Sequence, residues 1–142
     1  LLLLYGEQGM KEKMELFSQM DETQQLKETE KSGRELADRF GLKSIVITGV
    51  DVVCGDGSVK MGNLVIEENE ADWYFSIKEG GSYSGTGDLF ASVLSAGMVK
   101  GISMKECVQK AIAFLARAIH DAVLEGTDRN DGVCFEKYLK ML

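Results

Sequence analysis

The sequence of 142 residues lacks any segment long and apolar enough to cross a membrane. It also contains no proline, one histidine and one tryptophan. The apolar run at its start, Leu1–Leu4, is much shorter than the about twenty apolar residues that a spanning helix needs. No charged segment precedes this run, so we expect no signal peptide. The sequence therefore predicts no membrane partner.

A cluster of basic residues is missing as well. The formal net charge is -7, from 16 Lys and Arg residues against 23 Asp and Glu residues. Nucleic-acid binding needs clustered Lys and Arg side chains, and no basic stripe is visible. We therefore predict no nucleic-acid partner. An acidic protein can still bind a small anion in a local cradle of backbone N–H groups.

Cysteine is scarce, with three residues at Cys54, Cys107 and Cys134. Their number is odd and their spacing is not that of metal ligands. We expect reduced thiols in a cytoplasmic protein, with a disulfide as the alternative.

The first half of the chain alternates helical and strand patterns. Apolar spacing predicts a helix over Thr23–Phe40, ended by Gly41. The β-branched run Ile45–Val50 is typical of a strand that is buried on both faces of a parallel sheet. Val59–Glu67 and Asp72–Lys78 are predicted as two strands of an antiparallel edge, joined by a polar turn.

The remaining segments are mostly helical or polar. A helix is expected with one apolar face at Leu89, Val93, Ala96 and Gly97, and it is ended by Gly101. The capping box Ser103–Glu106 opens a second helix, which ends near Glu125. We expect a mobile connection or a loosely packed helix over Gly6–Asp21, a solvated loop over Glu125–Asp131 and a short helix at the C-terminus.

The turn Ser82–Phe90 is rich in glycine and runs directly into an apolar helical pattern. The first N–H groups of a helix have no internal partner and carry partial positive charge, so phosphate oxygens bind there. Gly85 and Gly87 allow the backbone to approach a ligand closely, and Ser84 or Thr86 can supply a cap or a hydroxyl contact. The turn is therefore a candidate anion site.

Asp88 adds a carboxylate in the first turn of this helix. It can accept a proton from a substrate hydroxyl while the N–H groups hold a transferring phosphoryl group. The plain alternative is an aspartate that only complements the helix dipole. The turn is not a Walker A loop, because Thr86 stands where lysine is required, and Phe90 occupies the third glycine position of a dinucleotide fingerprint.

The run Gly85–Phe90 resembles the G-T-G-D signature of the ribokinase-like small-molecule kinases, and more narrowly that of the pyridoxal and pyridoxamine kinases. Three further segments resemble parts of proteins of the same family. Leu1–Glu7 resembles the helix that follows the family's conserved Asn and Glu motif, and Ser44–Val50 resembles the strand and loop that reach the nucleotide. Ala111–Val123 resembles the long helix whose start flanks the adenine site. The resemblance covers nearly the whole chain.

The resemblance implies an α/β fold, the C-terminal portion of a three-layer αβα architecture. Parallel strands would be joined by antiparallel edge strands, with helices packed on the sheet. Because such kinases are much longer, we expect residues 1–142 to form one partial domain, the nucleotide-binding half, without the N-terminal half. The isolated chain is then expected to be inactive and to form homo-oligomers, since a sheet edge without neighbours invites association.

The implied reaction transfers the γ-phosphoryl group of ATP, with Mg²⁺, to the hydroxymethyl group of pyridoxamine, pyridoxal or pyridoxine. Asp88 would be the base, and the N–H groups of Gly85, Thr86 and Gly87 would form the anion hole. The implied nucleotide-binding residues are Thr48, Gly49, Trp73, Tyr74, Phe75, Ser76 and Ala111. A simple strand exit at Thr48 and Gly49, and an edge strand burying Trp73 and Phe75, are the structural alternatives.

Other candidate residues favour structural roles. Asp51, Asp56 and Asp72 are better explained as scattered surface aspartates than as Mg²⁺ ligands, because phosphate and water supply most ligands of Mg²⁺ in such kinases. No residue is assigned to a metal. His120 is expected to cap or pack rather than catalyse.

Two other functions are open on the sequence alone. A kinase for hydroxymethylpyrimidine or phosphomethylpyrimidine, acting in thiamine synthesis, shares the fold and the turn. A non-catalytic nucleotide-binding or oligomerising remnant belongs to a different class.

Overall fold

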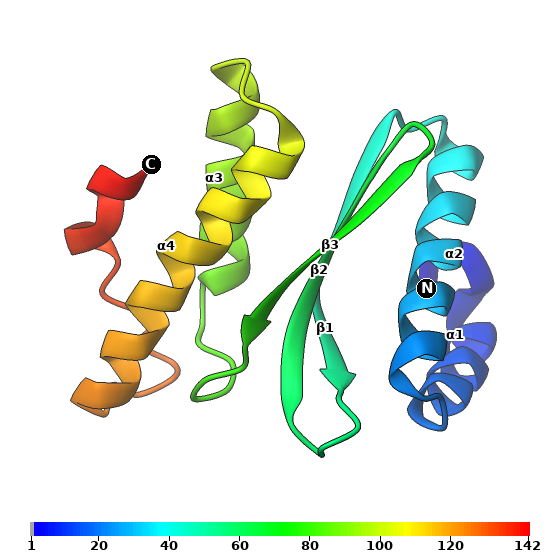
Figure 1. Ribbon diagram of the computed structural model, residues 1–142, viewed down its shortest axis with the longest axis horizontal. Coiled ribbons are helices and arrows are strands. Elements are labelled where there is room, and N and C mark those ends of the chain that lie inside the picture. The colour runs from blue at the N-terminus through cyan, green and yellow to red at the C-terminus, as the bar shows by residue number, and fades with distance from the viewer. Residues whose placement is uncertain (1) are drawn as a thin grey trace. The chain divides into compact units, whose positions relative to one another are not determined.

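The computed structural model describes residues 2–142, so Leu1 and the side chains of residues 2–5 lie outside the description. The chain divides into two compact units, Leu1–Phe75 and Ser76–Leu142, and each is described here by itself. The elements follow one another along the chain as Figure 1 shows. They are α1 (Leu2–Ser18), α2 (Glu22–Phe40), β1 (Ser44–Val53), β2 (Val59–Glu67), β3 (Glu70–Ile77), α3 (Thr86–Val99), α4 (Met104–Glu125) and the 3-10 helix η1 (Glu136–Met141).

The first unit is built on a three-stranded antiparallel sheet in the order β1-β2-β3. Ser44 lies opposite Glu67 and Val53 opposite Val59, so β1 and β2 form a long hairpin. Asp56 fixes the turn, because its carboxylate accepts hydrogen bonds from the Ser58 amide at 2.9 Å and the Ser58 hydroxyl at 2.6 Å. The side-chain bond, followed by the amide bond, holds the pKa of Asp56 below its usual value.

Helix α2 packs on β1 and β2. Its start is a capping box, in which the Asp21 carboxylate accepts from the Gln24 amide at 2.9 Å, and it ends at Gly41 in the left-handed region. Gly33 faces the sheet so closely that a Cβ would lie 2.6 Å from Cδ1 of Ile66. The absence of a side chain at position 33 therefore allows this helix to approach the strands.

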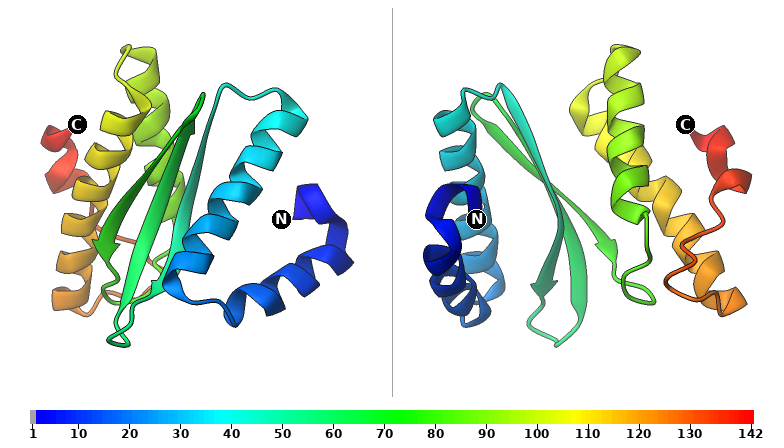
Figure 2. Two further views of the ribbon diagram at one scale, coloured as in Figure 1. Left: turned by 45° about the vertical axis from the view of Figure 1, so that its right-hand side comes forward. Right: turned by 180° about the vertical axis from the view of Figure 1, so that it is seen from behind.

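Helix α1 precedes α2 and is joined to it at one end by a short turn (Figure 2). Of the two structures predicted for Gly6–Asp21, a mobile connection or a loosely packed helix, the structure contains the helix over most of the segment. A break occurs at Gly6, whose φ is 69°. Lys13 of α1 forms an ion pair with Glu28 of α2, which links the two helices.

The strand predicted at Ile45–Val50 is present, but its surroundings differ from the prediction. It extends to Val53 and pairs antiparallel with β2, and no parallel pair occurs among residues 2–142. Ser44–Ile47 are half-buried, and the middle of the strand is exposed rather than buried on both faces. The predicted edge strand Val59–Glu67 is the central strand of the sheet. A short apolar run in the sequence is compatible both with a central strand of a parallel sheet and with an antiparallel strand that a helix covers on one face, so the run alone does not decide between them.

The second unit is built on α3 and α4, which pack side by side (Figure 1). Ser103 caps α4 by accepting from the Glu106 amide at 3.3 Å, which is the Ser103 side-chain half of the predicted capping box, and α4 ends at Gly126. The apolar side of α4 is buried at Cys107, Val108, Ala111, Phe114, Leu115, Ala118 and Ala122. No helix in the described part of the chain, residues 2–142, is long and apolar enough to cross a membrane. Cys54, Cys107 and Cys134 are free.

The C-terminal helix η1 is attached to α4 by apolar and polar contacts. The rings of Phe114 and Phe135 meet edge to face, with centroids 6.3 Å apart. The Tyr138 hydroxyl donates to Asp121 at 2.6 Å, and Lys137 pairs with both Asp121 and Glu125. The bonds from Lys137 and then Tyr138 hold the pKa of Asp121 below its usual value, and Asp121 in turn raises the pKa values of Lys137 and Tyr138.

We predict that acid loosens the attachment of η1 to α4. A carboxyl group whose pKa is lowered by folding contributes stability above its unfolded pKa of about 3.9, and this stability is lost as the pH falls through the folded value. The NMR signals of the Tyr138 ring should therefore shift toward their unfolded positions between neutral pH and a pH below about 4, while the apolar contacts of η1 remain. Asp121→Asn should loosen η1 at neutral pH, whereas Glu125→Gln, which keeps the Asp121 contacts, should retain the acid transition. Persistence of the folded Tyr138 signals well below that range would contradict this role of Asp121.

Candidate active site

The predicted anion site lies at the start of α3. Gly85 is the N-cap residue, with φ 79° and ψ -7°, in the left-handed region that a residue with a Cβ adopts only at a cost. No side chain caps the helix. The amides of Gly87 and Asp88 therefore begin the helix without the acceptor that a capping side chain would supply.

Thr86 differs from the predicted capping role. Its Oγ1 donates to the carbonyl oxygen of Tyr83 at 2.9 Å, and its amide makes a long contact of 3.5 Å with the same oxygen. The hydroxyl thus closes the turn behind the helix start. The Thr86 amide is therefore partly engaged, whereas no side chain caps the amides of Gly87 and Asp88. Uncapped amides of this kind are what an anion site requires.

Tyr83 anchors the turn in the core of the second unit. Its side chain is only 6% exposed and forms a cluster with Ala118, Ala122 and Val133. Leu89 of α3 and Val123 of α4 pack against the same cluster. The residue just before the glycine-rich turn is therefore held by both α4 and the segment that follows it.

The segment after α4, predicted as a solvated loop over Glu125–Asp131, contributes to the turn. The Ser84 amide donates to the Arg129 carbonyl at 2.9 Å. Gly132 is buried, and a Cβ on it would lie 3.0 Å from the Ser84 carbonyl oxygen. The Arg129 guanidinium lies against Gly81, since a Cβ there would be 3.0 Å from Cζ. The sequence analysis did not predict a contribution from these residues. The local feature that could have indicated one is the pair Gly132-Val133, a glycine and an apolar residue that follow a polar stretch.

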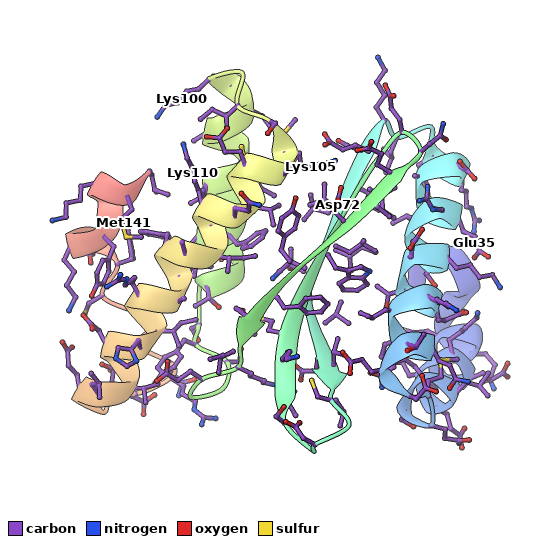
Figure 3. All side chains as sticks on the ribbon, in the orientation of Figure 1. Glu35, Asp72, Lys100, Lys105, Lys110 and Met141 are labelled. Carbon is purple, nitrogen blue, oxygen red and sulfur yellow. The ribbon has the colours of Figure 1, made fainter. Side chains whose placement is uncertain are left out.

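Asp88 occupies the first turn of α3, and its side chain is exposed. The lysines Lys100 and Lys105 lie at the other end of the α3–α4 pair, where the two helices are joined (Figure 3). Lys100 and Lys105 are therefore remote from Asp88, and the backbone N–H groups and the helix dipole supply positive potential beside it.

Thr48 and Gly49 lie at a β-bulge. The register of β1 with β2 shifts between Ile47 and Val50, and Gly49 has φ 69°. The sequence analysis placed these residues at a strand end, but the strand continues to Val53. Both residues are exposed. Bulges redirect side chains and are frequent beside active sites. Thr48 and Gly49 thus remain candidates for ligand contact because of the bulge and their exposure, and not because the strand ends there.

The strand predicted to line the nucleotide pocket carries a stacked aromatic pair. The rings of Trp73 and Phe75 have centroids 5.7 Å apart and an interplanar angle of 7°. They cover Gly62 of β2, where a Cβ would lie 2.8 Å from the Trp73 ring. Phe75 is 42% exposed. The neighbours Tyr74 and Ser76 are half-buried.

The candidate residues fall into two groups that belong to different units. Thr48, Gly49 and Trp73–Phe75 lie in the first unit, whereas the turn, Ser76 and Ala111 lie in the second. The turn residues Gly85–Asp88 are consecutive and share one helix start. Ala111 is fully buried, so its methyl group presents no surface to a ligand.

The remaining polar candidates have structural neighbours. Nδ1 of His120 lies 2.9 Å from Oε1 and 3.2 Å from Oε2 of Glu79, so it links α4 to the segment between β3 and α3. Among residues 2–142, no group of three or more His, Cys, Asp and Glu side chains is arranged to hold a metal ion.

Two shallow surface hollows, of about 370 and 330 Å³, lie along α2. Charged side chains such as Lys27, Lys31 and Glu35 line them, and none of the predicted site residues does. Ligand pockets are usually concave and largely apolar. We therefore assign the candidate site from the helix start and not from these hollows.

Comparison with known proteins supports a kinase relationship. The family model for phosphomethylpyrimidine kinase matches residues 10–132. A crystal structure of a proposed phosphomethylpyrimidine kinase from Bacteroides thetaiotaomicron is similar to this chain, with a TM-score of 0.70 and 25% sequence identity. The match covers 80% of this chain and 38% of that chain, so this chain spans well under half of the related structure. Comparison with curated proteins finds no match.

We predict that the Thr86 hydroxyl stabilises the turn. Thr86→Val removes the bond to the Tyr83 carbonyl while keeping the shape of the side chain. It should lower the free energy of unfolding by about 1 kcal/mol, the usual net contribution of one such bond. Thr86→Ser keeps the hydroxyl and should be more stable than Thr86→Val in denaturant unfolding followed by circular dichroism. Equal stability of the two variants would show that the hydroxyl contributes nothing.

Proposed function

Because the chain belongs to the phosphomethylpyrimidine kinase family, we propose that it supplies the phosphoryl-transfer site of an ATP-dependent, ribokinase-like small-molecule kinase. The activity is that of the whole enzyme, since this chain spans 38% of the related structure. Residues 1–142 are proposed to be the nucleotide-binding part of its domain. The proposed acceptor is a small heteroaromatic compound that carries either a hydroxymethyl group or the phosphate ester of that group.

The uncapped start of α3 is the observation that carries this proposal. Gly85 turns the chain into the helix without a capping side chain, and Asp88 follows in the first turn. Helix starts of this kind bind phosphate groups through backbone N–H donors. We propose that a carboxylate in the same turn as these donors acts on the acceptor of the same phosphoryl group.

The proposed reaction needs a base, an anion hole and an in-line acceptor. With a hydroxymethyl acceptor, Asp88 accepts the hydroxyl proton as the substrate oxygen attacks the γ-phosphorus of ATP. With phosphomethylpyrimidine, a phosphate oxygen of the substrate is the attacking atom instead. The bond from that phosphorus to the bridging oxygen breaks, and ADP leaves with the electron pair. The N–H groups of Gly85, Thr86 and Gly87 stabilise the charge on the transferring group. MgATP is the co-substrate, and the metal is bound mainly by phosphate and water.

Two different observations narrow the choice of the proposed acceptor substrate. The family model and the related structure both bear the phosphomethylpyrimidine kinase name, which favours hydroxymethylpyrimidine or phosphomethylpyrimidine. The G-T-G-D sequence at Gly85–Asp88 resembles that of pyridoxal and pyridoxamine kinases, which favours pyridoxamine, pyridoxal or pyridoxine as the second candidate. We place the pyrimidine first because the family match covers most of the chain.

The nucleotide contacts are proposed to come from the exposed bulge and the aromatic strand. Thr48 and Gly49 offer a hydroxyl and an exposed backbone. The half-exposed ring of Phe75 offers a flat apolar surface beside Trp73. Aromatic rings of this kind stack on nucleobases. Exchange broadening of the Trp73 indole signal on addition of ATP would support this part of the proposal.

A substrate panel tests the proposed function. The full-length product of the gene and this 142-residue chain are incubated with MgATP and each candidate acceptor: hydroxymethylpyrimidine, phosphomethylpyrimidine, pyridoxamine, pyridoxal and pyridoxine. Phosphorylated product from the full-length protein identifies the acceptor. ATP binding without any product would favour a non-catalytic nucleotide-binding protein.

We predict that Asp88→Asn abolishes most turnover without weakening ATP binding. The amide keeps the size of the side chain but cannot accept the hydroxyl proton. In the full-length kinase, kcat should fall at least about a hundredfold, as is typical when a general base is lost. The Kd for ATP, measured by calorimetry, should stay near that of the unaltered enzyme. Near-normal kcat in this variant would remove Asp88 from the mechanism.

A further inference from the structure

We infer that the segment Arg129–Val133 positions the anion-binding turn by holding the backbone of Ser84 at both its N–H and its carbonyl group. Gly132 is thereby a positioning residue for phosphate binding at the start of α3. The inference rests on the proposed function, because it concerns the same anion site. It assigns a role to a loop that has no side chain in the proposed reaction.

The first contact fixes the amide side of Ser84. Its N–H group donates to the Arg129 carbonyl oxygen at 2.9 Å. This bond joins two segments that lie far apart in the sequence. It also uses the backbone of Arg129, so the contact does not depend on the identity of that side chain.

The second contact restricts the carbonyl side of Ser84. A Cβ on Gly132 would lie 3.0 Å from the Ser84 carbonyl oxygen, and Gly132 has φ 80°. Any residue larger than glycine must therefore displace this oxygen or the loop itself. The Ser84 carbonyl belongs to the peptide group that contains the Gly85 N–H. Its orientation thus sets the direction of the first proposed phosphate donor.

The third contact fixes the neighbour of Ser84. Tyr83 packs against Val133 in a buried cluster, and its carbonyl oxygen accepts the hydrogen bond from Thr86. The segment after α4 therefore reaches both residues before Gly85. These contacts leave Gly85 itself open, since no atom lies within 4 Å of where its Cβ would be.

The need for such an external support follows from the composition of the turn. Glycine populates positive and negative φ about equally, so Gly85 and Gly87 alone do not hold one backbone direction. A capping side chain, the usual local support, is absent from this helix. Preorganised N–H donors bind an anion more tightly than mobile ones, because no ordering cost is added on binding. The contacts from Arg129–Val133 supply that order.

Gly132→Ala and Gly126→Ala form a matched pair for the test. Both glycines lie after α4 with positive φ, 80° and 66°, so both alanine variants carry similar backbone strain. A Cβ at Gly126 would have no atom within 4 Å, whereas one at Gly132 would meet Ser84. The 142-residue chain is labelled with ¹⁵N, and the amide signals of Gly85, Thr86 and Gly87 are followed without ligand and during titration with inorganic phosphate.

We expect these three signals to move in ligand-free Gly132→Ala and to stay in place in Gly126→Ala. The apparent affinity for phosphate should fall about tenfold or more in Gly132→Ala alone. Unchanged turn signals in folded Gly132→Ala would overturn the inference. If the unaltered chain shows no response to phosphate or to MgATP, the proposed function loses its support, while the ligand-free comparison still decides whether the loop positions the turn.

Val133→Ala provides a second variant in case Gly132→Ala does not fold. It weakens the packing on Tyr83 without adding backbone strain. We expect smaller movements of the same three amide signals, accompanied by a smaller loss of phosphate affinity. Turn signals identical to those of the unaltered chain would count against the inference in this variant too.

Discussion

A helix start that no side chain caps is the constraint on which the candidate site depends. The first N–H groups of α3 have no acceptor within the helix. The hydroxyl group of Thr86, the first residue of the helix, donates to the Tyr83 carbonyl oxygen instead of capping these groups. The same absence that weakens the helix end opens it to an anion. The surrounding contacts then have to provide the rigidity that a cap would otherwise give.

The contacts around this helix start come from segments that are remote in sequence. Tyr83 is buried against α4, Ser84 is bonded to Arg129, and Gly132 closes the other side. Asp88, in the first turn, remains exposed. Tyr83 and Ser84 are thus held rigidly, while the neighbouring Asp88 side chain is accessible to a substrate. Preorganised sites are usually built in this way, with buried residues that support an accessible reactive one.

Local features of the sequence predicted most helix and strand boundaries correctly, but they did not predict contacts between segments that are far apart in the sequence. Gly41 correctly marked the end of α2, Ser103 correctly marked the start of α4, and the strand Val59–Glu67 was predicted with its observed bounds. These features depend on residues a few positions apart. The bulge at Thr48-Gly49 could not be predicted, because it arises from the register with β2. The contribution of Arg129–Val133 was missed for the same reason, since polar residues there resemble any exposed loop. The roles of Asp88 and its neighbours in phosphoryl transfer stay predictions.

The stacked pair of Trp73 and Phe75 has a consequence for optical spectroscopy. Trp73 is the single tryptophan of the chain, and it is packed over Gly62 in the sheet. Its emission therefore reports the environment of β2 and β3, while Tyr83 and Tyr138 lie in the other compact unit. A fluorescence melt would follow the loosening of the sheet. It would be largely silent on a helical unit that opened at a different temperature.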